Sequence, residues 1–122
     1  MSSENPLLPI AVYGSLKQGK SSHHLLHGKP AIDQGWLTGF ELFDLGSHAA
    51  AVRGNGRLYV ELYSVTAEEL RRLDALEDYN ERRPARSLYR RETVSSPSGE
   101  PCWIYLYNRP VHMRPRVASG RW

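Results

Sequence analysis

The sequence predicts an α+β fold, a small mixed and mostly antiparallel β-barrel with one main helix and one short helix. Three observations favour this fold. Most apolar segments are short and rich in β-branched or aromatic residues, as strands are. The one strongly helical segment falls between strands without the repeated alternation of a doubly wound fold. Glycines interrupt a strand-like segment at 35, 39 and 46, which favours a curled sheet.

Size and composition indicate one domain over residues 1–122, with residues 1–6 as a loose tail. The net charge of +3 is mild, and a single cysteine excludes an internal disulfide. Cys102 lies in an apolar run and is interpreted as a core residue. The first ten residues lack a secretory pattern, and no apolar run approaches the ~20 residues of a membrane span. We therefore expect a cytoplasmic protein.

The first half of the chain is expected to form strands around two loops. Residues 8–13 are apolar and predict a strand, and Gly14 and Gly19 flank the loop that follows. Ser21 or Ser22 is expected to cap a short helix through Leu26, closed by Gly28. Residues 31–46 predict a bent strand. Gly54-Asn55-Gly56 predicts a turn, and residues 57–65 alternate between two faces as a strand does.

The main helix is predicted over residues 67–78. Thr66 and Glu69 have the spacing of a capping box, in which each side chain bonds the other residue's main-chain N–H. Beyond the helix, residues 80–88 are polar, contain Pro84 and predict a loop. Residues 89–94 and 102–107 predict two strands joined by a turn at 95–99, and residues 108–122 are expected to be irregular.

One carboxylate of this helix falls on its apolar side. At about 100° per residue, Glu77 lies about 20° from Leu70, within the stripe that Leu70 and Leu73 are expected to bury. Burial and the negative end of the helix dipole both raise a carboxyl pKa, toward the range of a proton shuttle. Two alternatives remain open. Glu77 pairs with one of the arginines 82, 83 or 90, or Asp74 is the partly buried acid instead.

The loop Tyr13-Gly14-Ser15-Leu16 directly follows the first strand. Glycine permits a tight turn, and successive main-chain N–H groups in such a turn can bind a carboxylate or phosphate. Taken alone this is a weak signal, since many Gly-Ser turns bind nothing. The loop is neither a P-loop nor a nucleophile elbow. His23 and His27 have the i, i+4 spacing of a helical metal pair but lack a third ligand, so no metal is predicted.

Arginines gather between residues 82 and 91. A nucleic-acid surface is one interpretation. We favour a solvated loop with some acidic partners, because no helix-turn-helix or zinc-finger spacing accompanies the cluster.

From about Ile10 to Trp122 the sequence resembles the gamma-glutamylcyclotransferase-like family, in particular its small bacterial and gamma-glutamylamine branch. The resemblance rests on short motifs in a specific order and spacing: Val12-Tyr13-Gly14-Ser15-Leu16, Leu42-Phe43-Asp44-Leu45-Gly46, Glu61-Leu62-Tyr63, Leu73-Asp74-Ala75-Leu76-Glu77-Asp78-Tyr79, Tyr89-Arg90-Arg91, Trp103-Ile104-Tyr105 and Ser119-Gly120-Arg121-Trp122.

The resemblance implies a small α+β barrel with a pocket at one end and an enzyme that cyclises a gamma-glutamyl amine or amide to 5-oxoproline. It implies that Glu77, rather than Asp74, is the acid/base. Substrate contacts are expected from Tyr13, Gly14, Ser15, Leu16, Tyr89 and Tyr105. No cofactor is expected. The implied partner is a small gamma-glutamyl molecule, without nucleic acid or membrane, and the chain is expected to be a monomer or weak homodimer.

The chain departs from the family pattern at a few positions. Val60 stands where the family usually has glycine, and Ser47-His48-Ala49-Ala50 stands where a proline is common. The arginine-rich segment 80–91 is expected to alter the lip of the pocket. A non-catalytic member of the same fold that binds a small metabolite is the alternative function.

Overall fold

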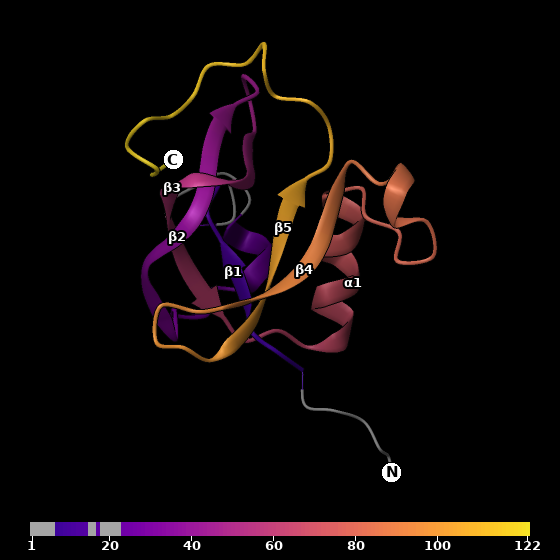
Figure 1. Cartoon of the computed structure of the whole chain (residues 1–122). Helices are drawn as coiled ribbons and strands as arrows, with labels where there is room; N and C mark the ends of the chain where they lie inside the picture. Colours follow the sequence, from indigo (N-terminus) through magenta and orange to yellow (C-terminus); the bar gives the residue numbers. More distant parts are fainter. Residues whose placement is uncertain (1–6, 15–16, 18–22) are drawn as a thin grey trace.

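A computed structural model describes residues 7–14, 17 and 23–122. Residues 1–6, and with them the predicted loose tail, lie outside this part of the chain. The described residues form five strands, one α-helix and two single-turn 3₁₀ helices, η1 and η2, arranged as in Figure 1. In chain order the elements are β1 (Ile10–Val12), η1 (His23–Leu26), β2 (Asp33–Asp44), β3 (Ala49–Tyr63), α1 (Ala67–Leu76), η2 (Pro84–Arg86), β4 (Tyr89–Ser95) and β5 (Pro101–Tyr107).

The five strands form one curled sheet in the order β2-β3-β1-β5-β4. Only β1 and β5 run parallel, and the other neighbours are antiparallel. The sheet wraps into a half-barrel, and α1 lies beside β4 and β5 (Figure 1). The predicted α+β class, its mostly antiparallel sheet and its single main helix are confirmed.

The predicted turn at Gly54-Asn55-Gly56 is wrong. These residues lie inside β3, and the chain reverses at residues 45–48 instead. The pairing of β2 with β3 shifts opposite this triplet, between Thr38 and Phe40, so the glycines form a bulge. A side chain at 54 would meet Glu41, since a Cβ there would lie 2.6 Å from the Glu41 side chain. The triplet therefore bends a long hairpin rather than ending a strand.

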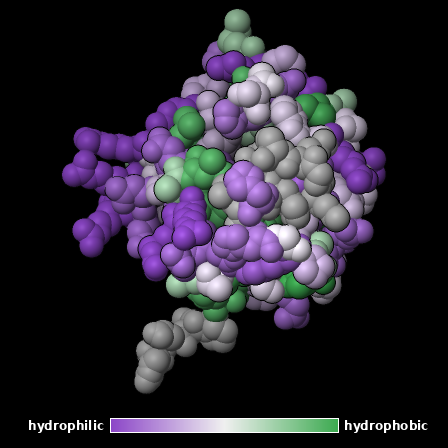
Figure 2. All heavy atoms as spheres, turned by 180° about the vertical axis from the view of Figure 1, so that it is seen from behind, coloured by the Kyte–Doolittle hydropathy of each residue, from purple (hydrophilic) through white to green (hydrophobic). Residues whose placement is uncertain are grey.

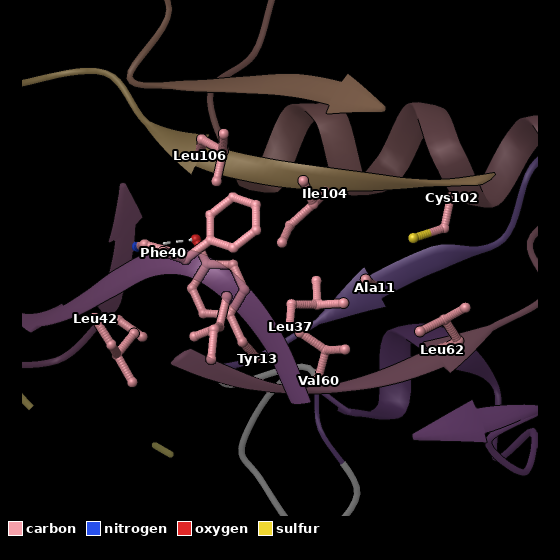
Figure 3. Packing of buried hydrophobic residues seen from close by; sticks show 13 residues of the cluster. Ala11, Tyr13, Leu37, Phe40, Leu42, Val60, Leu62, Cys102, Ile104 and Leu106 are labelled. Carbon is pink, nitrogen blue, oxygen red and sulfur yellow. Dashed lines mark hydrogen bonds between the residues drawn. The ribbon is translucent and has the colours of Figure 1, made fainter. Parts of the chain in front are cut away.

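The concave side of the sheet holds the larger apolar cluster. In Figure 3, Cys102, Ile104 and Leu106 of β5 lie across from Leu37 of β2 and Val60 of β3. Cys102 is fully buried, and burial raises its thiol pKa to about 11, which confirms its interpretation as a core residue. A second cluster joins the other face of β1 and β5 to the helix, and it includes Leu70 and Leu73 of α1.

The capping box of α1 is confirmed. The main-chain N–H of Glu69 donates to Thr66 Oγ1 at 3.1 Å, and the N–H of Thr66 donates to the Glu69 carboxylate at 2.9 Å. The helix ends at Leu76, two residues before the expected end. Asp78 has a left-handed φ of 54°, which is incompatible with a continuing helix. Glu77 is thereby placed at the C-cap, at the point where the chain leaves the helix.

The short helix before Gly28 is a single 3₁₀ turn over His23–Leu26, and Gly28 follows it with a φ of 70°. Its predicted caps, Ser21 and Ser22, lie outside the described residues. The loop at 80–88 contains η2, and hydrophilic side chains project from that side of the molecule in Figure 2. Within the described ranges, no helix is long and apolar enough to cross a membrane.

Candidate active site

A pocket opens where β1 ends, between the start of β3 and the end of α1. Its volume is about 400 Å³, including the space open to solvent at its mouth. Five elements or their flanking residues contribute to it, so it exists only in the folded chain. The lining residues are Ala11, Val12, Tyr13, Gly14, His48, Ala49, Glu77, Tyr89 and Tyr105.

The bent β2–β3 hairpin brings the start of β3 against the loop after β1. A Cβ at Gly14 would lie 3.1 Å from Ala49 Cβ, so glycine permits this close approach. The main-chain N–H of Ala51 donates to the Tyr13 hydroxyl at 3.3 Å, the bond drawn in Figure 3. These contacts fix one wall of the pocket.

Three tyrosines line the pocket, and each of their hydroxyls is hydrogen-bonded within the protein. Tyr13 donates to the carbonyl of Tyr105 at 2.6 Å, and Tyr89 donates to the carbonyl of Ala49 at 2.8 Å. Tyr105 donates to Asp74 Oδ1 at 2.6 Å. Burial is the largest cause that raises the pKa of all three phenols, and the Glu77 carboxylate adds to it. The tyrosines are therefore neutral and hold the pocket's shape.

Glu77 faces this pocket from the helix end. Burial raises its pKa from 4.5 to about 7. No ion pair to Glu77 occurs among residues 7–14, 17 and 23–122, so arginines 82, 83 and 90 do not hold it there. A carboxyl group that titrates near neutrality in a pocket can both accept and return a proton.

Asp74, the alternative acid, has a different environment. Its carboxylate accepts the Tyr105 hydroxyl and lies 3.1 Å from Arg91 Nε. The Arg91 guanidinium lies in turn over the Trp103 ring, 4.4 Å from its centroid. Burial raises the Asp74 pKa, while the Tyr105 hydrogen bond and Arg91 oppose the rise. Asp74 is thus tied to a structural network, and Glu77 is the carboxylate that faces the pocket without an ion pair in the described chain.

The structure brings together five of the predicted site residues, and Ser15 and Leu16 lie outside the described residues. The five are Tyr13, Gly14, Glu77, Tyr89 and Tyr105. Sequence reasoning missed His48 and Ala49. The sequence marks these two residues by its departure from the family pattern at Ser47-His48-Ala49-Ala50. The bend of the hairpin, which the sequence does not show, brings them to the pocket.

The predicted solvated loop with acidic partners is confirmed in part: Arg82, Arg83 and Arg86 are exposed and precede β4, whereas Arg90 and Arg91 lie within β4 and the Arg91 side chain is only 9% exposed. Arg90 lies 3.7 Å from Glu92, and Arg91 lies 3.9 Å from Glu81 in addition to its contact with Asp74. Among the described residues, no group of three or more His, Cys, Asp or Glu side chains has the arrangement of a metal site.

The chain is similar to known proteins over most of its length. The family described as gamma-glutamyl cyclotransferase, AIG2-like, matches residues 10–122. The Escherichia coli K12 gamma-glutamylcyclotransferase family protein YtfP is 32% identical over 113 residues, covering 93% of this chain and 94% of that protein. The gamma-L-glutamyl-butirosin B gamma-glutamyl cyclotransferase of Niallia circulans is 29% identical over 116 residues, covering 92% of this chain and 74% of that protein.

Solved structures show the same fold. The crystal structure of protein PH0828 from Pyrococcus horikoshii has a TM-score of 0.75 at 30% identity and covers 93% of this chain and 88% of its own. The solution structure of Escherichia coli ytfP has a TM-score of 0.71 at 33% identity, with coverages of 94% and 96%. Sequence and structure therefore agree that this chain belongs to the AIG2-like gamma-glutamyl cyclotransferase family.

Proposed function

We propose that the chain is a gamma-glutamylcyclotransferase that converts a gamma-glutamyl amine or amide to 5-oxoproline and releases the amine. The observation that carries the proposal is Glu77, a pocket carboxyl group with a pKa of about 7 and no ion pair in the described chain. Family membership and the activity named for the Niallia circulans relative favour the same reaction class.

In the proposed reaction, Glu77 first takes a proton from the substrate's alpha-ammonium group. The freed amine attacks the gamma-carbonyl carbon, and a carbon–nitrogen bond forms as the five-membered ring closes. The bond from that carbon to the amide nitrogen then breaks, and protonated Glu77 gives its proton to the leaving nitrogen. Of the three alpha-ammonium protons, one stays on the ring nitrogen. The other two reach the released amine one after the other through Glu77, the second coming from the ring nitrogen after it has attacked, so the amine leaves as an ammonium ion and Glu77 is again a carboxylate.

The pocket's second contribution is conformational. The reacting amine and carbonyl belong to one flexible molecule, so holding it in a ring-forming conformation removes much of the entropic barrier. Gly14 and Glu77 both line the pocket. We assign the loop that begins Tyr13-Gly14, with Ser15 and Leu16, to the alpha-amino acid end of the substrate. Tyr89 and Tyr105 are assigned to its flanks.

The proposal is tested by 5-oxoproline release from a panel of gamma-glutamyl amines, amides and dipeptides. We expect Glu77→Gln to lower kcat/KM by about 10²–10⁴-fold, since glutamine keeps the shape of the side chain but cannot transfer the proton. Glu68→Gln is the matched control. It makes the same change on the same helix, where the side chain is 66% exposed and paired with Arg72, and it should leave the rate unchanged.

Equal rates for the native chain and Glu77→Gln across the panel would contradict the acid/base role. Thermal stabilisation of the protein by panel members without any 5-oxoproline would contradict the enzyme and support the binding-only alternative.

A further inference from the structure

A second pocket adjoins the first, and three residues line both. Its volume is about 510 Å³, including space open to solvent. The residues that line both pockets are His48, Glu77 and Tyr89, and they mark the junction at which the two spaces meet. The residues that belong to the second pocket alone are Leu45, Leu76, Leu88 and Tyr107.

The proposed reaction places its reacting carbon at this junction. Glu77 takes a proton from the alpha-nitrogen and later gives one to the leaving nitrogen, so both nitrogens come within its hydrogen-bond reach. In the tetrahedral intermediate both are bonded to the former carbonyl carbon. The oxygen on that carbon carries the negative charge that develops as the ring closes. A hydrogen-bond donor at the junction would stabilise this charge.

The pocket's tyrosines do not supply this donor. A phenol has one hydroxyl proton, and Tyr13, Tyr89 and Tyr105 each donate theirs to an oxygen atom of the protein, at 2.6–2.8 Å. Glu77 as a carboxylate has no proton to donate. Among the described side chains that line the first pocket, His48 is therefore the remaining hydrogen-bond donor.

One ring nitrogen of His48 is bound within the protein. Its Nδ1 lies 2.7 Å from Ser47 Oγ. When the serine hydroxyl donates to Nδ1, the neutral imidazole carries its proton on Nε2. Nε2 has no hydrogen-bond partner among the residues that the structure describes, so its N–H group is left for a ligand.

The main chain around His48 is fixed on both sides. Its carbonyl accepts the N–H of Leu45 at 2.9 Å, within the reversal between β2 and β3. The next residue, Ala49, accepts the Tyr89 hydroxyl at 2.8 Å, and its Cβ would lie 3.1 Å from a Cβ at Gly14. A donor carried by a fixed main chain needs little reorganisation when charge develops beside it.

We propose that His48 donates a hydrogen bond from Nε2–H to the gamma-carbonyl oxygen as negative charge develops on that oxygen. This inference rests on the proposed function and adds a catalytic residue to it. His48 keeps its proton throughout, so every proton transfer remains with Glu77. Ser47 is a positioning residue that selects the tautomer of the imidazole.

Two variants of similar shape separate the donor from the bulk of the side chain. Glutamine places an amide N–H₂ group near the position of Nε2, whereas methionine has no donor. We expect His48→Met to lower kcat for 5-oxoproline release by about 10²-fold and to leave KM within about twofold, because the bond strengthens only in the transition state. His48→Gln should keep kcat within about tenfold of the native value.

The matched control is His112→Met. His112 is exposed and lines neither pocket, so the same change there should leave kcat and KM unaltered. The pH profile is a second control. Because His48 transfers no proton, His48→Met should keep the native dependence of kcat/KM on the ionisation of Glu77.

The tautomer of His48 is measured without substrate. In ¹⁵N NMR at a pH of about 8, above the usual titration range of histidine, His48 should carry its proton on Nε2. Its signals are identified by their absence from His48→Gln. Ser47→Ala should weaken the preference for this tautomer and lower kcat, without the full loss of His48→Met.

Three results would overturn the inference while the native chain still forms 5-oxoproline. The first is a native kcat in His48→Met. The second is a raised KM with an unchanged kcat, which would assign His48 to binding of the ground state instead. The third is a proton on Nδ1 in the NMR spectrum. If the native chain releases no 5-oxoproline from any panel member, the proposed function itself is wrong and the inference falls with it.

Discussion

Glu77 and Asp74 lie within one turn of the same helix end, yet their surroundings differ. Asp74 is bound by Tyr105 and Arg91, so its carboxylate is compensated. Glu77 has no ion pair among the described residues, and burial leaves its carboxyl group with a pKa of about 7. A half-buried carboxylate without a counter-ion destabilises the fold, a cost that functional sites commonly carry.

This cost should be measurable as a dependence of stability on pH. The pKa of Glu77 is about 7 in the folded chain, against an ordinary 4.5, so between these values the folded state holds a proton that the unfolded state has lost. The free energy of unfolding therefore falls as pH rises through this window. Glu77→Gln should be about 1–3 kcal/mol more stable than the native chain at a pH of about 8 and no more stable at a pH of about 4. Urea unfolding at both pH values checks this, and an equal difference at the two would refute it.

At the scale of elements, α1 is fixed at its N-terminus by one acidic side chain. Glu69 is buried and accepts hydrogen bonds from the Thr66 N–H, from Lys29 Nζ and from His27 Nδ1. The helix start is thereby joined to the segment that follows η1. Burial alone would raise the Glu69 pKa, but the bonds from Lys29, Thr66 and His27 outweigh it and lower the pKa to about 2.

Glu69→Gln should therefore destabilise the protein in a pH-dependent way. A folded-state pKa of about 2 against 4.5 gives stability that is present above 4.5 and is lost as pH falls toward 2. We expect a loss of about 1–3 kcal/mol at neutral pH, shrinking in acid, by urea unfolding. Glu68→Gln removes only an exposed i, i+4 pair with Arg72 and should cost less than about 0.5 kcal/mol. If the two variants lost the same stability, the anchoring role of Glu69 would be wrong.

Elements with local signals could be predicted from the sequence. The capping box of α1 and the position of Glu77 on its apolar side follow from side-chain types at fixed spacing. The turn predicted at Gly54-Asn55-Gly56 is wrong because a turn signal is read from neighbouring residues alone. The role of this triplet depends on the strand with which it pairs. It lies opposite Gly39, between the paired positions Thr38 and Phe40 of β2, and forms a bulge there, and these partners are fixed only when β2 and β3 pair.

Only part of the candidate site could be predicted, because some of its residues have local sequence signals and others do not. Gly14 and Glu77 have signals of their own, whereas His48 and Ala49 reach the pocket through the bend of the hairpin. The second pocket is also a product of tertiary packing, because its four apolar residues come from four separate parts of the chain.

At the level of the whole molecule, the C-terminal segment, yellow in Figure 1, arches from the end of β5 back to β2 and β3. The N–H of Val117 donates to the carbonyl of Leu42 at 2.8 Å, and the N–H of Tyr59 donates to the carbonyl of Gly120 at 2.8 Å. Lys17, which follows the site loop, is buried, and its Nζ donates to the Trp122 main-chain oxygen at 2.9 Å. The C-terminal segment therefore links β2 and β3 to Lys17, which follows the loop at the pocket.

Gly120→Ala tests this closure. Gly120 has a φ of 75°, and a Cβ there would lie 2.1 Å from the Arg57 carbonyl oxygen. The substitution forces the segment away from β3, and we expect it to lower the free energy of unfolding by about 2 kcal/mol or more in urea. Gly99→Ala is the control, because its φ of 95° brings the same kind of strain with no atom within 4 Å. It should cost about 1–2 kcal/mol, and a larger loss for Gly99→Ala would contradict the account.

The acid/base role of Glu77 is tested by the pH dependence of kcat/KM for 5-oxoproline release. Glu77 must be a carboxylate to accept the alpha-ammonium proton, and its pKa is about 7. We expect kcat/KM to rise with pH through an inflection near that value. We also expect Glu77→Gln to lose the inflection together with most of the rate. A native profile that is flat across this range, or a Glu77→Gln variant that keeps both the inflection and the rate, would contradict it.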